Sequence, residues 1–337
     1  MERDLPVVLP EPGAHHEEPR LWPFDLPFPY RISPWHDRAR AHSRGWVQRT
    51  GLAPDAAALR RHDRYDMALF ACLSYPDAAR DGLELVADWV SWWSIWNDFP
   101  DDPDFIGTPG RAEAFFASLT AVLDSPAPRS DGPRTDDPHI RAFADIWRRW
   151  CEGMSPAFVA RTGANWKHWF AAYLTRCEQR REHVLLDVDE YLALREVTGA
   201  ARLEMDAAER CGRYEVPDDV LDSGLLRRMR HLTAQVINIT QDVQSLAKEE
   251  AAGDRHNLVI VLEQRHGATR EQALTRIHSM AREHTDAFLR AEADLPRLLD
   301  RLRIAVERRT PVHRHVADLR SLMRGCVDFC AASGRYR

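Results

Sequence analysis

The sequence predicts an all-α protein in which residues 36–337 form a single helical bundle of about ten or more helices. Three observations support this fold class. Apolar residues recur at spacings of three and four through most of the chain, no segment alternates apolar and polar residues as a strand would, and no internal repeat is present. A chain of 337 residues is long for one domain, but an all-helical domain of this size can bury a substantial core.

The first 35 residues differ from the rest of the chain. They hold many prolines and little apolar periodicity, and they lack the charged-then-apolar layout of a secretory signal. We predict an extended, partly disordered leader over residues 1–35 and a helical domain over residues 36–337. The stretch SPAPRSDGPRTDDP, at 125–138, is predicted to be a surface loop because proline, glycine, serine and aspartate dominate it.

Aromatic residues mark the helical periodicity most clearly. Val86, Trp89, Val90, Trp93 and Trp96 keep one face of a predicted helix apolar. The same spacing recurs in two later segments, at Ile140, Phe143, Trp147 and Trp150, and at Trp166, Trp169, Phe170 and Tyr173. Most of these aromatic residues are expected to pack in the core of the bundle.

Two longer segments, 222–250 and 269–300, are rich in Leu, Ala, Arg and Glu and contain no proline before Pro296. This composition predicts a long helix in each segment. Thr269 and Gln272 have the spacing of a capping box, in which each side chain bonds to the backbone of the other, so we expect the second helix to begin there.

Composition excludes several classes of function. The 46 basic and 52 acidic residues give a net charge of −6, and no basic stripe is present, so we expect no nucleic-acid partner. No run of about 18 apolar residues exists, so we expect no membrane span. The six cysteines are scattered and form no CxxC pair, which is typical of reduced core cysteines in a cytoplasmic protein.

The stretch WSIWNDFPDD, which begins at Trp93, places large aromatic residues directly before a group of carboxylates. If this stretch is helical, Trp89, Trp93, Asn97 and Asp101 are each four residues apart and share one face, with Asp98 one step round the helix. That face would change from aromatic to oxygen-rich along its length. Taken alone, the pattern is more typical of an acidic helix end followed by a turn, because acidic clusters are common at the ends of elements.

A second motif, QDVQSLAKE, also places oxygen-bearing side chains at helical spacing, and the two motifs together suggest a metal site. Gln241, Ser245 and Glu249 follow each other at intervals of four, so three oxygen-bearing side chains lie on one stripe of a helix. Amide, hydroxyl and carboxylate oxygens are hard ligands that suit Mg²⁺. Lys248 lies beside the stripe and could meet an anion. The two motifs together predict two helix faces that meet around metal ions.

These motifs resemble those of bacterial class I terpene synthases. That family carries an aspartate-rich motif on one helix and an Asn-Asp-x-x-Ser-x-x-x-Glu motif on a facing helix, often with lysine just before the glutamate. The stretches NDFPD, from Asn97, and QDVQSLAKE, from Gln241, correspond to them. The resemblance implies six metal ligands, which are Asn97, Asp98, Asp101, Gln241, Ser245 and Glu249.

Further landmarks support the resemblance over residues 22–337. Arg195 lies 46 residues before Gln241, where the family has its diphosphate-sensing arginine, and Thr198 and Gly199 correspond to the neighbours at the helix break. The stretch HNLVIVL, which follows the second motif, is also similar to the family. The family's terminal Arg-Tyr pair has its counterpart in Arg335 and Tyr336.

Both metal motifs depart from the family pattern at their first residue. Asn97 stands where the family has aspartate, which removes one negative charge from the site, and Gln241 stands where the family has asparagine, which adds one methylene. An amide oxygen can still coordinate Mg²⁺. Asn238, one turn before Gln241, is a substitute ligand with a less suitable spacing. We therefore predict a functional but atypical metal cluster, with a catalytically lapsed protein as the alternative.

The resemblance implies an isoprenyl diphosphate substrate and three Mg²⁺ ions. Arg195, Lys248, Arg335 and Tyr336 are expected to bind the diphosphate, and no protein nucleophile is needed. Departure of the diphosphate leaves an allylic carbocation, so the pocket must be dry and lined with aromatic faces that attract a cation without bonding to it. The expected catalytic residues are Arg195, Thr198, Gly199, Trp93 and Trp89, with Phe329 as a weaker candidate for the pocket wall.

Several functions remain open at this stage. Farnesyl diphosphate is the default substrate for family members of this length, while geranyl, geranylgeranyl or pre-cyclised diphosphates are alternatives. Prenyl chain elongation on the same fold is disfavoured, because elongation enzymes carry two aspartate-rich motifs. An isoprenoid-binding helical protein without activity is the non-enzymatic alternative. Homodimers are common in the family, and the sequence itself does not specify the oligomeric state.

Overall fold

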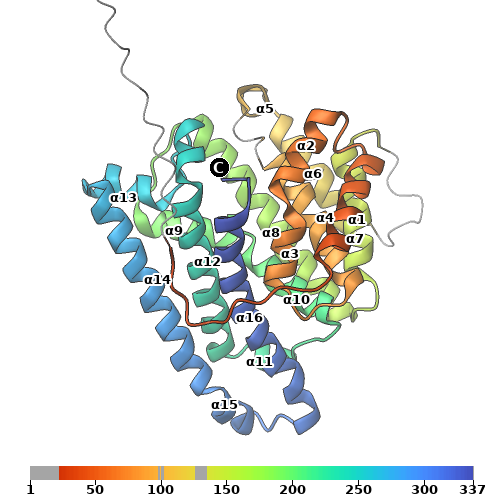
Figure 1. The fold of residues 1–337 in the computed structure, drawn as a ribbon, viewed down its shortest axis with the longest axis vertical. Coiled ribbons are helices and arrows are strands. Elements are labelled where there is room, and N and C mark those ends of the chain that lie inside the picture. The colour runs from red at the N-terminus through yellow and green to blue at the C-terminus, as the bar shows by residue number, and fades with distance from the viewer. Residues whose placement is uncertain (1–22, 98, 100–101, 126–134, 337) are drawn as a thin grey trace, which may run out of the picture.

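The computed structural model describes residues 23–97, 99, 102–125 and 135–336, and within these ranges all regular secondary structure is helical (Figure 1). The prediction of an all-α fold is therefore confirmed. The helices are α1 (His36–Thr50), α2 (Ala56–Tyr65), α3 (Met67–Ser74), α4 (Arg80–Trp96), α5 (Pro103–Gly107), α6 (Arg111–Leu123), α7 (Pro138–Cys151), α8 (Pro156–Arg181), α9 (Val188–Thr198), α10 (Ala201–Gly212), α11 (Asp218–Leu221), α12 (Gly224–Ala251), α13 (Leu258–His266), α14 (Arg270–Ala293), α15 (Leu295–Arg301) and α16 (Val306–Ala332).

The helices pack side by side around α12 and α16. Helix α12 contacts α14 on one side and α16 on the other, and α3 lies between α16 and α4 (Figure 1). Helix α4 also packs against α1, α7 and α10, so it is covered on several sides. This burial explains why its sequence is apolar around much of its circumference. No helix in the described part of the chain is long and apolar enough to cross a membrane.

Helix termini follow local sequence signals. The predicted capping box opens α14, where the Thr269 side chain accepts from the Gln272 backbone and the Gln272 side chain accepts from the Thr269 backbone. The predicted helix at 269–300 is divided, however, because α14 ends at Ala293 and α15 begins at Leu295. Pro296 explains the division, since it has no backbone N–H to continue the ladder of α14.

Tryptophan side chains form the centre of one half of the bundle. Trp92, Trp96 and Trp166 are fully buried. The Trp92 ring stacks on Phe143 with ring centroids 5.1 Å apart, and Trp92 and Trp96 meet edge to face at 5.2 Å. Offset and edge-to-face arrangements favour aromatic pairs beyond the area that they bury. The periodic aromatic residues of α4, α7 and α8 are therefore mainly core residues, as expected.

Residues 23–35 cross the bundle as an extended segment before α1. Figure 1 shows this segment running across α14, α12 and α16. The Phe24 ring stacks on His278 of α14 at 4.3 Å, Phe28 meets Phe288 edge to face, and both phenylalanines are buried. Burial of these apolar rings holds the segment against the helices. Most of the predicted leader, residues 1–22, lies outside the described residues.

Helix α4 is shorter than the first motif predicted. It ends at Trp96, with Asn97 as its C-cap, so the helix that carries Trp89 and Trp93 does not continue past Asn97 as predicted. This part of the prediction is wrong because Pro100 has no backbone N–H to give to the carbonyl of Trp96. Asp98 and Asp101 themselves lie outside the described residues, as does most of the predicted loop at 125–138.

Candidate active site

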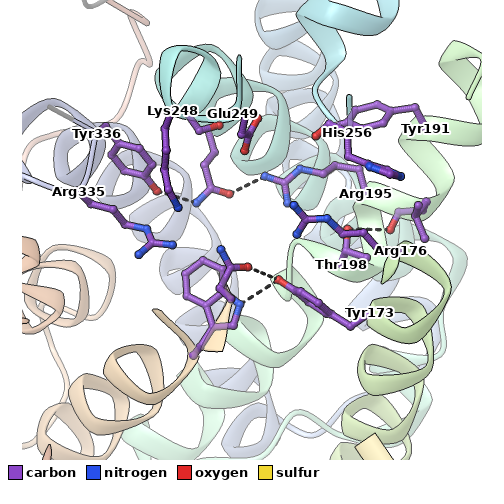
Figure 2. A pocket seen from close by; sticks show the side chains of 15 residues that line it. Tyr173, Arg176, Tyr191, Arg195, Thr198, Lys248, Glu249, His256, Arg335 and Tyr336 are labelled. Carbon is purple, nitrogen blue, oxygen red and sulfur yellow. Dashed lines mark hydrogen bonds between the residues drawn. The ribbon is translucent and has the colours of Figure 1, made fainter. Parts of the chain in front are cut away.

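One pocket opens between α4, α8, α9, α12 and the C-terminal segment. It brings together ten residues that the sequence singled out, which are Trp93, Asn97, Arg195, Thr198, Gln241, Ser245, Lys248, Glu249, Arg335 and Tyr336. Figure 2 shows Arg195 and Arg176 reaching into the pocket from one side and Lys248 and Arg335 from the other. The pocket mouth is therefore lined by cationic side chains and by the oxygens of the second motif.

Arg195 is the best-anchored cation of the pocket. Its Nε donates to Oδ1 of Asp242 at 2.9 Å, and its Nη2 donates to Oε1 of Gln241 at 2.6 Å. Asp242 is 1% exposed and also accepts from the Tyr191 hydroxyl and the Leu258 backbone N–H. Burial lowers the pKa of Arg195, but the Asp242 carboxylate more than offsets this and raises it overall. The guanidinium is thus permanently charged and held in one orientation.

Gln241 connects Arg195 to the C-terminus. Its amide oxygen accepts from Arg195, and its Nε2 donates to the Tyr336 hydroxyl at 3.1 Å. The extra methylene of glutamine over asparagine gives the amide the reach to contact both partners. In this arrangement the oxygen that the resemblance assigned to a metal ion is used by a guanidinium.

The Asn97 side chain is held by a residue that the sequence did not single out for the site. Tyr173 donates its hydroxyl to Oδ1 of Asn97 at 2.7 Å and accepts from Nε1 of Trp93 at 3.0 Å. This chain of hydrogen bonds aims the Asn97 oxygen into the pocket mouth. Tyr173 was predicted only as part of an apolar helix face, because its contact with Asn97 depends on the packing of α8 against the end of α4.

Glu249 and Ser245 lie on the stripe that α12 presents to the pocket. Oε2 of Glu249 accepts from Asn257 at 2.6 Å, and the buried Ser245 hydroxyl donates to the Asp242 carbonyl at 3.4 Å. Burial, and then the nearby carboxylates of Asp242 and Asp254, raise the pKa of Glu249 to about 7. The surroundings of Glu249 are therefore rich in negative charge, which a bound cation would offset.

Arg335 is packed between aromatic rings at the C-terminal side. Its guanidinium lies 5.1 Å from the ring centroid of Tyr65 and 5.3 Å from that of Trp93, and the residue is 5% exposed. Cation–π contacts of this kind hold a guanidinium without neutralising it. Arg335 is thus positioned beside Trp93, the residue predicted as the pocket wall.

Arg176 of α8 lines the same pocket, although the sequence analysis did not single it out. It forms an ion pair with the buried Asp254, and its guanidinium lies 5.7 Å from the ring centroid of Tyr173. His256 completes this wall, with Nδ1 bonded to Asp254 and Nε2 to Gln179. No short motif marks this arrangement, because the contacts of Arg176 with Asp254 and of His256 with Gln179 each span more than 70 positions of the chain.

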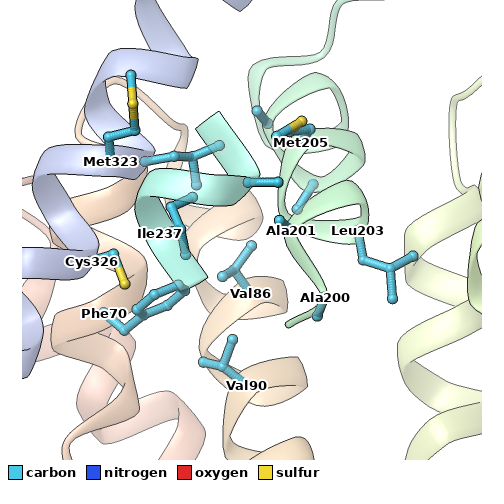
Figure 3. Close-up of a cluster of buried hydrophobic side chains, with 14 of the residues drawn as sticks. Phe70, Val86, Val90, Ala200, Ala201, Leu203, Met205, Ile237, Met323 and Cys326 are labelled. Carbon is cyan, nitrogen blue, oxygen red and sulfur yellow. The ribbon is translucent and has the colours of Figure 1, made fainter. Parts of the chain in front are cut away.

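An apolar pocket continues inward from the mouth. Trp93, Gln241 and Tyr336 line both pockets, so they form the boundary between them. Trp89 and Phe329, predicted as wall residues, line the inner pocket. The remaining lining residues are Met67, Phe70, Val90, Gly199, Ala200 and Glu204. Figure 3 labels Phe70, Val90 and Ala200 within the surrounding cluster of apolar side chains.

The helix break between α9 and α10 lies at this boundary. Helix α9 ends at Thr198, and Ala200 has a left-handed backbone with φ of +60° before α10 begins. Asn238 Nδ2 donates to the carbonyl of Arg195 at 3.1 Å, which holds the break against α12. Asn238 is 1% exposed and faces the break, so it does not replace Gln241 in the pocket.

Gly199→Ala is expected to destabilise the protein by about 1–3 kcal/mol. A Cβ at this position would lie 1.9 Å from Oδ1 of Asn238 and 2.9 Å from the Arg195 carbonyl, so the break must move. Urea unfolding measures the effect. Gly224→Ala is the matched control, because a Cβ there meets nothing within 4 Å. Equal unfolding curves for the two variants would show that the break tolerates a side chain.

Glu204 of α10 is the unexpected member of the inner pocket. It is 8% exposed, and its Oε2 has no hydrogen-bond partner among the described residues. Burial raises the pKa of Glu204 to about 8, against a smaller lowering by Arg195. The side chain therefore carries a proton at neutral pH, in contrast to an ordinary surface glutamate.

Glu204→Gln is expected to flatten the pH dependence of stability between pH 5 and pH 8. A glutamate whose pKa is raised on folding contributes stability below its unfolded value near 4.3, and this contribution is lost as pH rises towards the folded value. Wild type should therefore lose roughly 3 kcal/mol more than the variant over this range. Urea unfolding of both proteins at each pH measures the difference, and parallel profiles would mean that Glu204 is ionised in the folded protein.

Comparison with known proteins places this chain in a family. The model "Terpene synthase family 2, C-terminal metal binding" matches residues 88–287. The chain is 35% identical to the pentalenene synthase of Streptomyces avermitilis, over 93% of this chain and 92% of that protein. It is 32% identical to the (-)-beta-caryophyllene synthase ((2E,6E)-farnesyl diphosphate cyclizing) of Saccharothrix espanaensis, over 94% and 89%.

A solved structure shares the fold over nearly its whole length. Linalool/nerolidol synthase from Streptomyces clavuligerus in complex with 2-fluorogeranyl diphosphate matches with a TM-score of 0.80 at 30% identity, covering 89% of this chain and 100% of that one. The fold is therefore that of the all-helical terpene synthases. Because the family model matches more than half of the chain, the protein belongs to terpene synthase family 2.

The family implies a divalent metal, and the donor chemistry of the pocket fits one. Ser245 and Glu249 present hard oxygens on the stripe of α12, and Asn97 presents an amide oxygen across the pocket mouth. Gln241 fits less well, since its oxygen accepts from Arg195. No group of three His, Cys, Asp or Glu side chains suited to a metal occurs within the described ranges.

Proposed function

We propose that the protein catalyses the Mg²⁺-dependent ionisation and cyclisation of an isoprenyl diphosphate, with farnesyl diphosphate as its substrate, and releases diphosphate and a terpene. One observation carries this proposal: oxygen ligands and four cationic side chains surround a pocket mouth that continues into an apolar pocket. A diphosphate suits the mouth and a hydrocarbon chain suits the interior. The Saccharothrix relative is a farnesyl diphosphate-cyclizing enzyme, which supports the choice of substrate.

Binding of the diphosphate is assigned to the cationic side chains. The Arg195 guanidinium is held in a fixed orientation by Asp242, and the Arg335 guanidinium lies between two aromatic rings. The Lys248 side chain and the Tyr336 hydroxyl are the other donors assigned to the diphosphate. Three Mg²⁺ ions are expected, held by Asn97, Asp98, Asp101, Gln241, Ser245 and Glu249. When bound, magnesium supplies the positive charge that stabilises the departing diphosphate.

We assign to the inner pocket the role of shielding the carbocation from water. Trp93 and Trp89 present aromatic surfaces next to the boundary, and attraction of a cation to such a face contributes up to about 2 kcal/mol when water is absent. Thr198 and Gly199 form the helix break between the diphosphate region and this pocket. Exclusion of water there prevents premature capture of the cation.

Incubation of the purified protein with geranyl, farnesyl and geranylgeranyl diphosphate tests the proposal. We expect cyclic products from farnesyl diphosphate by mass spectrometry, with diphosphate release that stops on addition of EDTA. Preference for geranylgeranyl diphosphate would instead make the protein a diterpene synthase, and longer products on addition of isopentenyl diphosphate would indicate chain elongation. Absence of diphosphate release from every substrate, with an intact fold, would contradict the proposal.

A catalytically lapsed isoprenoid-binding protein is the second candidate. The specific observation in its favour is the Gln241 oxygen, which accepts from Arg195 at 2.6 Å. A binder of this kind would take up an isoprenyl diphosphate without metal. Calorimetric titration with an uncleavable diphosphate analogue, with and without Mg²⁺, separates the two candidates, because only the enzyme is expected to need the metal for tight binding.

Asn97→Asp is expected to lower the Mg²⁺ concentration for half-maximal activity by about tenfold. Aspartate keeps an oxygen acceptor for the Tyr173 hydroxyl and restores one negative charge at the pocket mouth. Magnesium titration of diphosphate release measures the change. Asp102→Asn, at a residue whose carboxylate caps α5, controls for general charge effects. An unchanged titration for Asn97→Asp would remove Asn97 from the metal ligands.

A further inference from the structure

Glu204 is the one carboxyl group that lines the inner apolar pocket within the described part of the chain. Its neighbours in the lining include Phe70, Trp89 and Phe329, which offer no hydrogen bond to it. Its Oε2 is buried and without a partner in the described structure. An unpartnered polar atom in such surroundings costs stability, and a chemical role for Glu204 in the pocket would explain why the carboxyl group is there.

Other buried carboxylates of the bundle have partners. Asp206, on the same helix, is bonded by Asn165 and Arg230, and Glu209 is bonded by Arg161 and the Val216 backbone. These ion pairs and hydrogen bonds explain their burial. Glu204 differs because its carboxyl group faces the space where, under the proposed function, the hydrocarbon would react.

We propose that Glu204 is the acid–base residue of the inner pocket, which donates a proton to an alkene carbon of a neutral cyclic intermediate and later takes a proton back. This inference rests on the proposed function, since it needs an isoprenoid in the pocket. It adds to that function a neutral intermediate and a second, proton-initiated cyclisation.

The proton transfers balance within one turnover. The neutral intermediate forms when the first cyclic cation loses a proton from a neighbouring carbon to an oxygen of the departed diphosphate, and the electrons of that C–H bond form a double bond. The O–H bond of Glu204 then breaks, the π-electron pair of the alkene forms a new C–H bond, and a carbocation and a carboxylate result. In the last, a C–H bond next to the final cation breaks, its electrons form the product double bond, and the proton returns to the carboxylate. No external oxidant, reductant or cofactor takes part.

The protonated form of Glu204 suits this role in two ways. A neutral carboxyl group can share a pocket with the first carbocation and keep its proton until the neutral intermediate has formed. Burial keeps the proton in place at neutral pH, and a carboxylic acid held neutral by apolar surroundings is an established way to supply a proton donor. The nearby Tyr75 hydroxyl is not a second candidate for the proton donor, because it donates its proton to the backbone carbonyl of Glu204.

Single turnover in D₂O tests the proposal. The protein is equilibrated in D₂O so that the Glu204 carboxyl carries deuterium, and farnesyl diphosphate is then added at a concentration below that of the enzyme. We expect one deuterium per product molecule by mass spectrometry. Glu204→Gln should yield an undeuterated product with fewer rings, while its diphosphate release stays measurable.

Controls separate this proposal from the proposed function. Asp206→Asn, which removes a buried carboxylate from the same helix but outside the pocket, should keep deuterium incorporation in its folded fraction, and Glu204→Asp should restore part of it. Diphosphate release by wild type with an undeuterated product would overturn the role of Glu204, as would unchanged deuterated product from Glu204→Gln. Absence of diphosphate release by wild type would instead contradict the proposed function.

Discussion

Glu249→Gln is expected to lower the rate of diphosphate release by about 10³-fold. Glutamine keeps the size of the side chain and an oxygen to accept from Asn257, but it removes the one carboxylate that the described part of the second motif presents to the pocket. Loss of that charge weakens metal binding and, through it, stabilisation of the leaving diphosphate. Glu249→Ala, which also removes the oxygen, should abolish release altogether.

A coupled enzymatic assay of diphosphate release at saturating Mg²⁺ measures the rates of the wild type and the variants. The adjacent residue provides a matched control, because Glu250 is exposed and pairs with Arg270 on the outer surface. Glu250→Gln changes the net charge equally and should leave activity within about twofold of wild type. A Glu249→Gln protein that retains a tenth or more of wild-type activity would remove Glu249 from the metal ligands.

Arg195→Lys is expected to lower the rate of diphosphate release by about 10²-fold although the charge is kept. Arginine donates to Asp242 and Gln241 at once from two arms of its planar fork, and a lysine ammonium has no such geometry. The remaining donors of Arg195 are thereby aimed at the pocket. Lysine would bind Asp242 alone, so the positioning of the diphosphate and the link through Gln241 to Tyr336 would both be lost.

Stability and activity must be separated for this residue. Arg195→Met would leave the buried Asp242 without its cation, at a cost of about 3–5 kcal/mol, so a loss of activity in that variant alone would be ambiguous. Arg195→Lys avoids most of this cost, and thermal unfolding checks that it does. Arg202→Lys, at an exposed arginine paired with Glu196, is the control. An active and equally stable Arg195→Lys variant would mean that the forked geometry has no part in catalysis.

Local signals in the chain were sufficient for the architecture. Intervals of three and four between apolar residues specify helices because they repeat with the helical turn, and the capping box at Thr269 specifies where α14 begins. The second motif needed nothing beyond its own helix, since Gln241, Ser245 and Glu249 share a stripe by geometry alone. These features depend on residues within a few positions of each other.

The partners of the site residues come from packing between distant segments. Tyr173 reaches Asn97 from 76 positions away, and Tyr336 reaches Gln241 from 95 positions away. The environment of Glu204 is likewise made by α3, α4 and the end of α16, so its missing partner and raised pKa have no local signal. Helix periodicity tells which face of a segment is apolar, but the neighbour that covers that face is chosen by the assembly of the whole bundle. The chemistry of the pocket therefore follows from contacts over long sequence separations, while its helical frame follows from short ones.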